Sequence, residues 1–179
     1  MEIYDLVAQA IGLAAMTFNI LSYQQKKDGA VIAFQLFGAL LFSVNFFMIG
    51  GIIGGILNVV AAIRAVIFVN ANRFHARHIF WQIGFFVVFV LSYIATFTVF
   101  KTSVTPFNLL IEVFPVIGLT ATTVSFRFSD ASVIRKFAFI SSPAWLIYNV
   151  IHFSLGGIIC EALSIVSVVI GMIRHDRKK

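Results

Sequence analysis

The sequence predicts an all-α integral membrane protein with seven transmembrane helices, arranged as two parallel three-helix bundles joined by a linker helix. The first observation behind this prediction is composition: 60% of the residues are hydrophobic, 11% are charged, and the mean hydropathy is +1.01. A soluble domain cannot bury so much apolar surface, so the bilayer must surround most side chains. The second observation is an internal repeat. Gly-Gly-Ile-Ile at 50–53 returns at 156–159, and 15 of 63 positions are identical when residues 11–73 are laid over residues 117–179.

Apolar segments long enough to cross the hydrocarbon, which takes roughly 20 residues each, follow one another along the chain. We place seven of them at 4–23, 30–49, 51–69, 79–99, 107–126, 133–153 and 155–174. Backbone polar groups cannot stay unpaired in lipid, so each segment must be helical. Short glycine-containing connections separate the second from the third segment and the sixth from the seventh. These pairs should form antiparallel hairpins in which glycine supplies the turn conformations.

Each repeat contains three segments, and segment 79–99 lies between the repeats without a counterpart. We therefore divide the chain into a first bundle at 1–73, a linker helix within 74–103 and a second bundle at 104–179. With three helices in each repeat, the second repeat would insert in the membrane upside down relative to the first. The extra crossing by segment 79–99 gives both repeats the same orientation. The two bundles should then be related by a pseudo-twofold axis along the membrane normal.

Lysine and arginine residues predict the orientation in the membrane. One side would carry only Lys101, together with the acidic Glu2 and Asp5. The other would carry eleven basic residues: Lys26, Lys27, Arg73, Arg77, Arg127, Arg135, Lys136, Arg174, Arg177, Lys178 and Lys179. This bias places the N-terminus outside and the C-terminus in the cytoplasm. It also explains the net charge of +6 without nucleic acid as a partner. The N-terminus has no basic leader or small-residue cleavage site, so we expect no signal peptide.

Short motifs add a family resemblance. The first segment ends in Ser-Tyr-Gln-Gln-Lys-Lys-Asp-Gly at 22–29, and a polar residue, Asn58 or Ser164, lies midway along the third segment of each repeat. With the three-plus-one-plus-three order of segments, these features resemble the SWEET and PQ-loop transporter superfamily, and within it the YgjV-type bacterial inner-membrane proteins. The resemblance implies alternating-access movement of a small polar solute, sugar-like or nucleoside- or vitamin-like, through a central cavity. Tyr23 stands where PQ-loop proteins carry proline, and only Pro115 and Pro143 lie within helices. Bending would then be asymmetric, carried by glycines, or lost.

Polar and aromatic side chains near the middle of the helices are the candidates for solute binding. Asn58 and Ser164 are equivalent in the repeat and should face each other across the axis, where an amide and a hydroxyl can hydrogen-bond a polar solute. The walls of such a pocket would be formed by Phe42, Trp145, Tyr148 and Asn149. The alternative is that these residues only hold helices together, as Ser and Asn commonly do in membranes.

Glu112 and Glu161 are the two acids expected to be buried, and both should lie at a similar depth from the outer side. An ionisable group inside a bilayer usually faces a cavity or a partner. Burial and a second carboxylate nearby would keep at least one of the two acids protonated. We therefore expect proton or cation coupling at these residues, with a neutral acid bound to a neighbouring helix as the alternative. Arg64 is expected to extend to the cytoplasmic headgroups.

Metal, cofactor and enzymatic sites are not expected. The four histidines do not converge as a zinc site requires, and the single Cys160 excludes a disulfide framework. No phosphate-binding glycine loop or serine-nucleophile motif is present. The predicted partners are the lipid bilayer and a solute, with no oligomeric state implied. The rival to a transporter is a non-transporting sensor or assembly protein, which a dry axis packed with Phe would favour.

Overall fold

The computed structural model describes residues 3–22, 28–128 and 131–175. Glu2, Lys26, Lys27, Arg177, Lys178 and Lys179 of the predicted charge pattern, and Tyr23 of the predicted loop motif, lie outside these ranges. The described residues form helices and no strand. The helices are α1 Ile3–Ser22, α2 Asp28–Met48, α3 Ile52–Val69, α4 Ala71–Phe74, α5 Ile79–Thr98, α6 Pro106–Ile111, α7 Val113–Ser125, α8 Ala131–Ile151 and α9 Leu155–His175.

The all-helical prediction is confirmed for this part of the chain, with one helix broken. The segment predicted at 107–126 is divided at Glu112 into α6 and α7. Thr105 caps α6 by accepting a hydrogen bond from the Asn108 amide at 3.1 Å, and Pro106 occupies the first turn, where its missing N–H costs nothing. Pro115 has no N–H to donate to the Ile111 carbonyl, so the hydrogen-bond ladder is interrupted just where the helix breaks.

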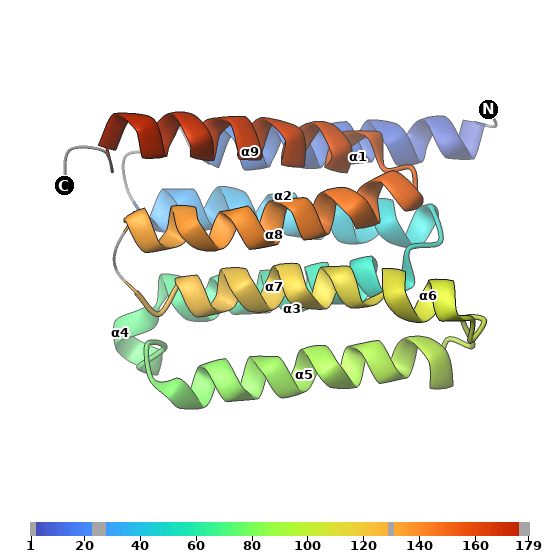
Figure 1. Cartoon of the computed structure of the whole chain (residues 1–179), viewed down its shortest axis with the longest axis horizontal. Coiled ribbons are helices and arrows are strands. Elements are labelled where there is room, and N and C mark those ends of the chain that lie inside the picture. Colours follow the sequence, from blue (N-terminus) through green and yellow to red (C-terminus); the bar gives the residue numbers. More distant parts are fainter. Residues whose placement is uncertain (1–2, 23–27, 129–130, 176–179) are drawn as a thin grey trace.

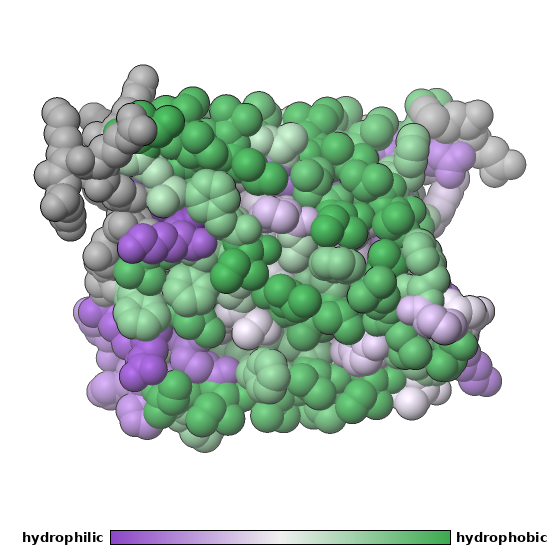
Figure 2. Space-filling view, in the orientation of Figure 1, coloured by the Kyte–Doolittle hydropathy of each residue, from purple (hydrophilic) through white to green (hydrophobic). Residues whose placement is uncertain are grey.

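Four helical stretches in the described residues are long and apolar enough to cross a membrane: α1, α3, α5 and the combined stretch Pro106–Ser125. Shorter apolar helical stretches, Ala33–Met48 and Leu155–Ile170, lie within α2 and α9. Figure 2 shows the same property on the surface, where apolar side chains cover the middle of the molecule and hydrophilic ones gather toward its two ends. A crossing by each of the seven predicted segments stays a prediction.

The helices form two layers, with α1–α3 behind and α7–α9 in front (Figure 1). Within the layers α2 packs between α1 and α3, and α8 between α7 and α9. Contacts of α1 with α9, and of α3 with α7, join the layers at their edges. The six helices therefore form a closed ring in the order α1, α2, α3, α7, α8, α9. Helix α5 lies outside this ring against α3 and α7.

The two ends of the bundle differ in charge. Arg73, Arg77 and Arg127 lie at the end where α3 and α7 finish, and Arg135 and Lys136 lie near the start of α8 at the same end. We call this the basic end. The opposite end holds the turn between α2 and α3, the connection from α5 to α6, and the turn between α8 and α9.

The two hairpin turns use different residues, which corrects the expectation that glycine shapes both. Gly50 adopts φ +78° in the turn between α2 and α3, as expected. In the second turn Phe153 takes the left-handed conformation, with φ 56°, whereas Gly156 and Gly157 lie inside α9. The Gln9 side chain holds this turn: its Nε2 donates to the Phe153 carbonyl at 2.8 Å, and its Oε1 accepts from the Leu155 amide at 3.0 Å.

Helices α1 and α9 touch through their backbones. A Cβ atom added to Gly156 would lie 2.1 Å from the carbonyl carbon and oxygen of Gly12. Asn45 of α2 strengthens this edge, because its Nδ2 donates to the Ala8 carbonyl at 2.8 Å and its Oδ1 accepts from the Ser154 hydroxyl at 2.7 Å. Small residues and buried amides are what helices use to associate closely in lipid.

Candidate functional site

A cavity of about 630 Å³ lies between the two layers of helices. Its volume is in the range of small-molecule pockets, ~300–1,000 Å³. All six helices of the ring contribute to its lining, and α5 does not. The lining includes amides, hydroxyls, one acid and two arginines, with aromatic rings on α2 and α8. An apolar bundle therefore encloses a space with many hydrogen-bonding groups.

The cavity extends toward the basic end. Asn19 in the last turn of α1, Ser125 at the end of α7 and Arg135 near the start of α8 all line it. At the opposite end its last lining residues include Phe46 and Asn149. Beyond them the side chains are tightly packed: Phe46 contacts Trp145 at 6.0 Å and Tyr148 at 5.5 Å between ring centroids.

Five of the six residues predicted to bind solute line this cavity: Phe42, Asn58, Trp145, Asn149 and Ser164. Asn58 donates from Nδ2 to the Gly54 carbonyl of its own helix at 2.8 Å, and its Oδ1 accepts no hydrogen bond from a described residue. Ser164 interacts with the Cys160 thiol one turn earlier. The structure thus places the two residues of the repeat pair on the walls of one cavity, contributed by α3 and α9.

Asn149 is one of the most deeply buried polar residues of the lining. Only 2% of its surface is exposed, and its Oδ1 has no hydrogen-bond partner among the described residues. A Cβ atom on Gly157 would approach this oxygen to 2.2 Å, so the glycine leaves the space in which the amide lies. Trp145 has a similar relationship with Gly118, where a Cβ atom would lie 2.6 Å from the indole.

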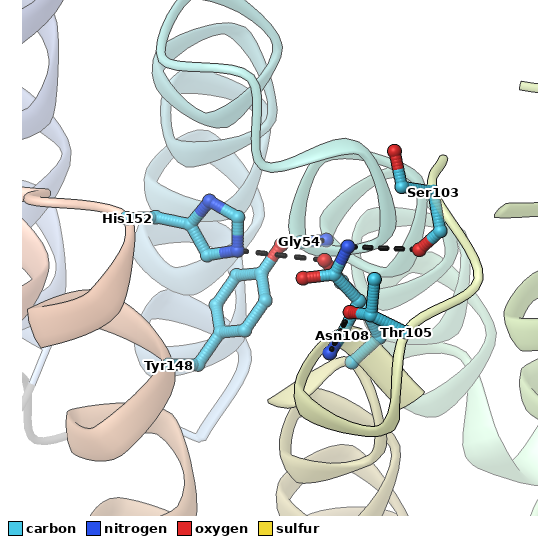
Figure 3. A network of polar contacts seen from close by, with 7 residues as sticks. Gly54, Ser103, Thr105, Asn108, Tyr148 and His152 are labelled. Atoms are coloured by element: carbon cyan, nitrogen blue, oxygen red, sulfur yellow. Dashed lines mark hydrogen bonds and ion pairs between the residues drawn. The ribbon is translucent and has the colours of Figure 1, made fainter. Parts of the chain in front are cut away.

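Tyr148, the sixth predicted residue, lies beside the cavity and does not line it. Trp145 and Asn149 are four residues apart on α8 and share a face, whereas Tyr148 is rotated by about 100° from Asn149. Its hydroxyl accepts a hydrogen bond from the Gly54 amide at 3.1 Å. Figure 3 shows this hydroxyl pointing at Gly54, with the His152 ring alongside. The ring centroids of Tyr148 and His152 are 4.3 Å apart.

The two glutamates belong to different groups of residues, and the structure shows no interaction between them. Glu161 lines the cavity and hydrogen-bonds Ser142 of α8. Glu112 is buried at the break between α6 and α7, outside the cavity lining, with its Oε1 atom 3.5 Å from His152 Nε2. Only Glu161 is therefore placed to meet a molecule in the cavity.

The prediction that Arg64 extends to the headgroups is wrong. Its side chain is 7% exposed and donates from Nη1 to the Thr123 hydroxyl at 2.7 Å and to the Leu119 carbonyl at 3.5 Å. Its Cζ atom lies 4.7 Å from the centroid of the Phe126 ring. Helix α7 offers acceptors and an aromatic face within reach of α3, so the guanidinium turns inward and lines the cavity.

Several polar lining residues were not singled out from the sequence. They are Asn19, Gln35, Thr122, Ser125, Arg135, Ser141, Ser142 and Ser167. A signal for some of them exists in the spacing, since Ser141, Trp145 and Asn149 recur at every fourth residue of α8, and Ser164 and Ser167 are three apart on α9. A face that keeps polar residues at this spacing in a lipid-embedded helix indicates an interior surface.

The opposite end is sealed by a separate set of polar contacts. Asn108 donates from Nδ2 to the Ser103 carbonyl at 2.8 Å, which fixes the connection before α6 (Figure 3). Gln9, Asn45 and Tyr148 tie the two layers together as described above. None of these four side chains lines the cavity. The structure thus has a cavity that extends toward one end of the bundle and a hydrogen-bonded closure at the other.

Comparison with known protein families gives one match. The family described as Imp-YgjV, bacterial inner membrane protein, matches residues 6–179, nearly the whole chain. Comparison with curated proteins and with solved structures gives no match.

Proposed function

Because the chain belongs to the Imp-YgjV family of bacterial inner membrane proteins, we propose that it is a transporter or facilitator that moves a small polar solute through the cavity between its helix layers. The observation that supports this proposal is the enclosed polar lining. A helix face in lipid gains nothing from so many hydroxyl and amide groups unless they meet water or a solute.

The proposed architecture has seven spans: α1, α2, α3, α5, the α6–α7 stretch, α8 and α9. It is SWEET-like, with α5 as the linker between two parallel three-helix bundles. Raising residue numbers by 106 moves α1 onto α7, α2 onto α8 and α3 onto α9. When the two repeats are exchanged in this way, the contact of α3 with α7 corresponds to the contact of α9 with α1. The order of helices around the ring is therefore the same after the exchange. This agreement favours the pseudo-twofold relation. The basic end would face the cytoplasm.

The proposed mechanism is alternating access. The cavity extends toward the basic end, which supports a state that would open toward that side. Release to the other side requires the contacts of Tyr148 with Gly54, of Gln9 with the second turn, and of Ser154 with Asn45 to break. Pro143 in the middle of α8 leaves the Phe139 carbonyl without its helical donor and provides one place where that helix can bend.

The proposed solute contacts are the Asn58 and Asn149 amides and the Ser164 hydroxyl, with Trp145 and Phe42 as apolar walls. Both amides have an acceptor oxygen that no described residue engages. Glu161 is the proposed coupling group, because it is the acid that lines the cavity. Glu112 lies outside the cavity lining, and its contact with His152 is proposed to help hold the sealed end together.

Side-specific labelling tests this proposal without knowledge of the solute. In a Cys160→Ala background, Ser164→Cys should react with a membrane-impermeant thiol reagent added from the basic side. Under turnover with a crude metabolite mixture, it should become reactive from the opposite side as well. Metabolites that raise the melting temperature are then tested for uptake into proteoliposomes, with protein-free liposomes as the control.

The rival function, a non-transporting sensor or assembly protein, is favoured by the aromatic packing of Phe46, Trp145 and Tyr148 at the sealed end. It predicts access to Ser164→Cys from one side under every condition, and no uptake above that of empty liposomes for any stabilising metabolite. That result would replace the transport proposal.

A further inference from the structure

We propose that the solute of this cavity carries an oxyanion, a carboxylate or a phosphate, and that the guanidinium of Arg64 binds it. The inference rests on the proposed function, because it names the chemical class of the molecule that the cavity would accept. Arg64 is buried in the cavity wall, and some of its hydrogen-bond donors have no partner among the described residues.

The protein fixes one side of the Arg64 guanidinium. Nη1 donates to Thr123 and to the Leu119 carbonyl, and the Phe126 ring lies against the guanidinium at 4.7 Å from its centroid to Cζ. Nε is buried without a hydrogen-bond partner, and Nη2 has none among the described residues. The edge formed by Nε and Nη2 is the one that binds both oxygens of a carboxylate or two oxygens of a phosphate. The protein therefore orients the fork and leaves the Nε–Nη2 edge without a hydrogen-bond partner among the described residues.

The charge of Arg64 is not neutralised. The side chain forms no ion pair with a described residue, although it is 7% exposed and lies within a helix that is apolar enough to span a membrane. An arginine inside a bilayer is strongly unfavourable unless it meets water, an anion or another partner. Two neutral acceptors and a ring face position the group but carry no negative charge. An anion in the cavity would supply the negative charge that Arg64 lacks nearby.

The rest of the lining fits an anionic group at this level. Arg135 also lines the cavity near the basic end, so a second positive charge stands on the route toward Arg64. The hydroxyls of Thr122 and Ser125 line the same stretch, but each donates to a carbonyl of its own helix and would have to rotate to meet an anion. Asn58 lies six residues earlier on α3, about 9 Å deeper at ~1.5 Å per residue, and can bind the polar remainder of the molecule.

The acid of the cavity is far enough away to allow this assignment. Glu161 aligns with Gly55 in the repeat, nine residues before Arg64, which places the two levels about 13 Å apart along the axis. Glu161 is thus neither an ion-pair partner of Arg64 nor an immediate source of repulsion for an anion bound there. Arg64 can therefore bind the solute while Glu161 serves in coupling during the proposed transport cycle.

The alternative is that Arg64 only locks α3 to α7 through Thr123. The two roles are separated by melting the purified protein in an uncharged detergent, with inorganic phosphate or succinate added at constant ionic strength maintained by chloride. Wild type should show a saturable rise in melting temperature with at least one of the two anions. Arg64→Met should weaken the apparent affinity by roughly 10- to 100-fold, since the charge-assisted bonds are lost.

Three further variants keep the test decisive even if Arg64→Met does not fold. Arg64→Lys keeps the charge but not the fork, and should retain a reduced response. Thr123→Val removes the contact with α7 and should lower stability while the anion still binds. Arg73→Met, an equal change of charge at an exposed position outside the cavity, should respond as wild type does.

The outcomes divide as follows. A response of Arg64→Met or Arg64→Lys equal to that of wild type, or no response of wild type to either anion, overturns the inference. Arg64-dependent stabilisation by phosphatidylglycerol in nanodiscs, with both small anions ineffective, assigns the oxyanion to a lipid headgroup and overturns the solute assignment. Uptake of a neutral solute with no competition by anions overturns this inference while the transport function stands. Arg64-dependent anion binding without any uptake would instead count against transport alone.

Discussion

The hydroxyl of Tyr148 accepts a hydrogen bond from the Gly54 amide at 3.1 Å and thereby joins α8 to α3 at the sealed end of the cavity. The bond is one-sided, because Phe42, the repeat equivalent of Tyr148, has no hydroxyl with which to form its counterpart. This bond between α3 and α8 depends on one oxygen atom, which Tyr148→Phe removes with little change in the shape of the side chain.

Tyr148→Phe should weaken the sealed end. The hydroxyl bonds the Gly54 amide and also interacts with the Glu112 carboxyl, so its loss corresponds to about 1–2 kcal/mol and the melting temperature should fall by a few degrees. Ser164→Cys combined with Tyr148→Phe should also react faster with an impermeant thiol reagent from the sealed side. Tyr93→Phe is the matched control, since the Tyr93 hydroxyl bonds the Leu109 carbonyl outside the cavity. Equal labelling rates in the two variants would show that the Tyr148 bond does not limit opening.

Asn58→Leu should reduce solute binding more than Ser164→Ala does. Removing the amide leaves polar groups of a bound solute unpaired, a loss of about 1–3 kcal/mol or ~5- to 150-fold in affinity, whereas one hydroxyl makes fewer bonds. Binding and melting temperature are measured on the same purified proteins. If Asn58 acts only within the helix, through its bond to the Gly54 carbonyl, stability will fall and binding per folded molecule will stay unchanged.

Glu161→Gln should abolish the pH dependence of uptake while the protein stays folded. The amide can keep the hydrogen bond to Ser142 but cannot exchange a proton in the cavity. Uptake is compared with and without a pH gradient across proteoliposomes. Glu112→Gln is the control outside the cavity lining: its contact with His152 is weakened, so stability should fall while the gradient still drives uptake. A wild-type pH response in Glu161→Gln would exclude this acid from coupling.

Two glycine substitutions should have opposite effects on stability. In Gly156→Ala the new Cβ meets the Gly12 backbone at 2.1 Å, and α1 and α9 must separate, so a loss of several kcal/mol is expected. Gly84 lies in α5 with no atom within 4 Å of such a Cβ, and Gly84→Ala should stabilise its helix by up to about 1 kcal/mol. Thermal unfolding of both proteins in the same detergent checks the pair. Similar melting temperatures would mean that the two helices do not touch as described.

Cysteine labelling can fix the orientation. In a Cys160→Ala background, Lys101→Cys should react with an impermeant reagent on intact cells, and Arg77→Cys only after the membrane is opened. The two positions lie at opposite ends of the bundle, so one experiment reports both sides. Labelling of Arg77→Cys on intact cells would place the basic end outside.

The positions of most helices were predictable from the sequence. Apolar segments in lipid must be helical, and the repeat shows where corresponding helices begin and end. Trp145, Asn149, Asn58 and Ser164 could be assigned to one interior because spacing along a helix defines its faces. The partner of a side chain on another helix could not be obtained in this way. Arg64 shows the difference: its depth follows from its own helix, but Thr123 and Phe126 become its neighbours only through the packing of α7 on α3.

The break at Glu112 had a signal in Pro106 and Pro115, which flank it, but the apolar run across both prolines outweighed it. Tyr148 was predicted to line the cavity but lies beside it. It follows Ile147 and precedes Asn149, and a residue next to a lining residue on a helix points about 100° away from it. The turn between α8 and α9 does not use glycine as expected. Gly156 lies where α9 contacts α1, and Phe153 adopts the left-handed conformation of the turn.

The charges of the cavity bear on why two halves share one polypeptide. Arg64 aligns with Ile170, and Glu161 aligns with Gly55, so each charge occurs in one half only. A homodimer of a single half would have to carry both charges twice, with two arginines and two glutamates facing the same enclosed space, where like charges repel strongly. Because both repeats lie in one chain, equivalent positions can carry different residues. The cavity therefore presents a positive group from one repeat and an acid from the other.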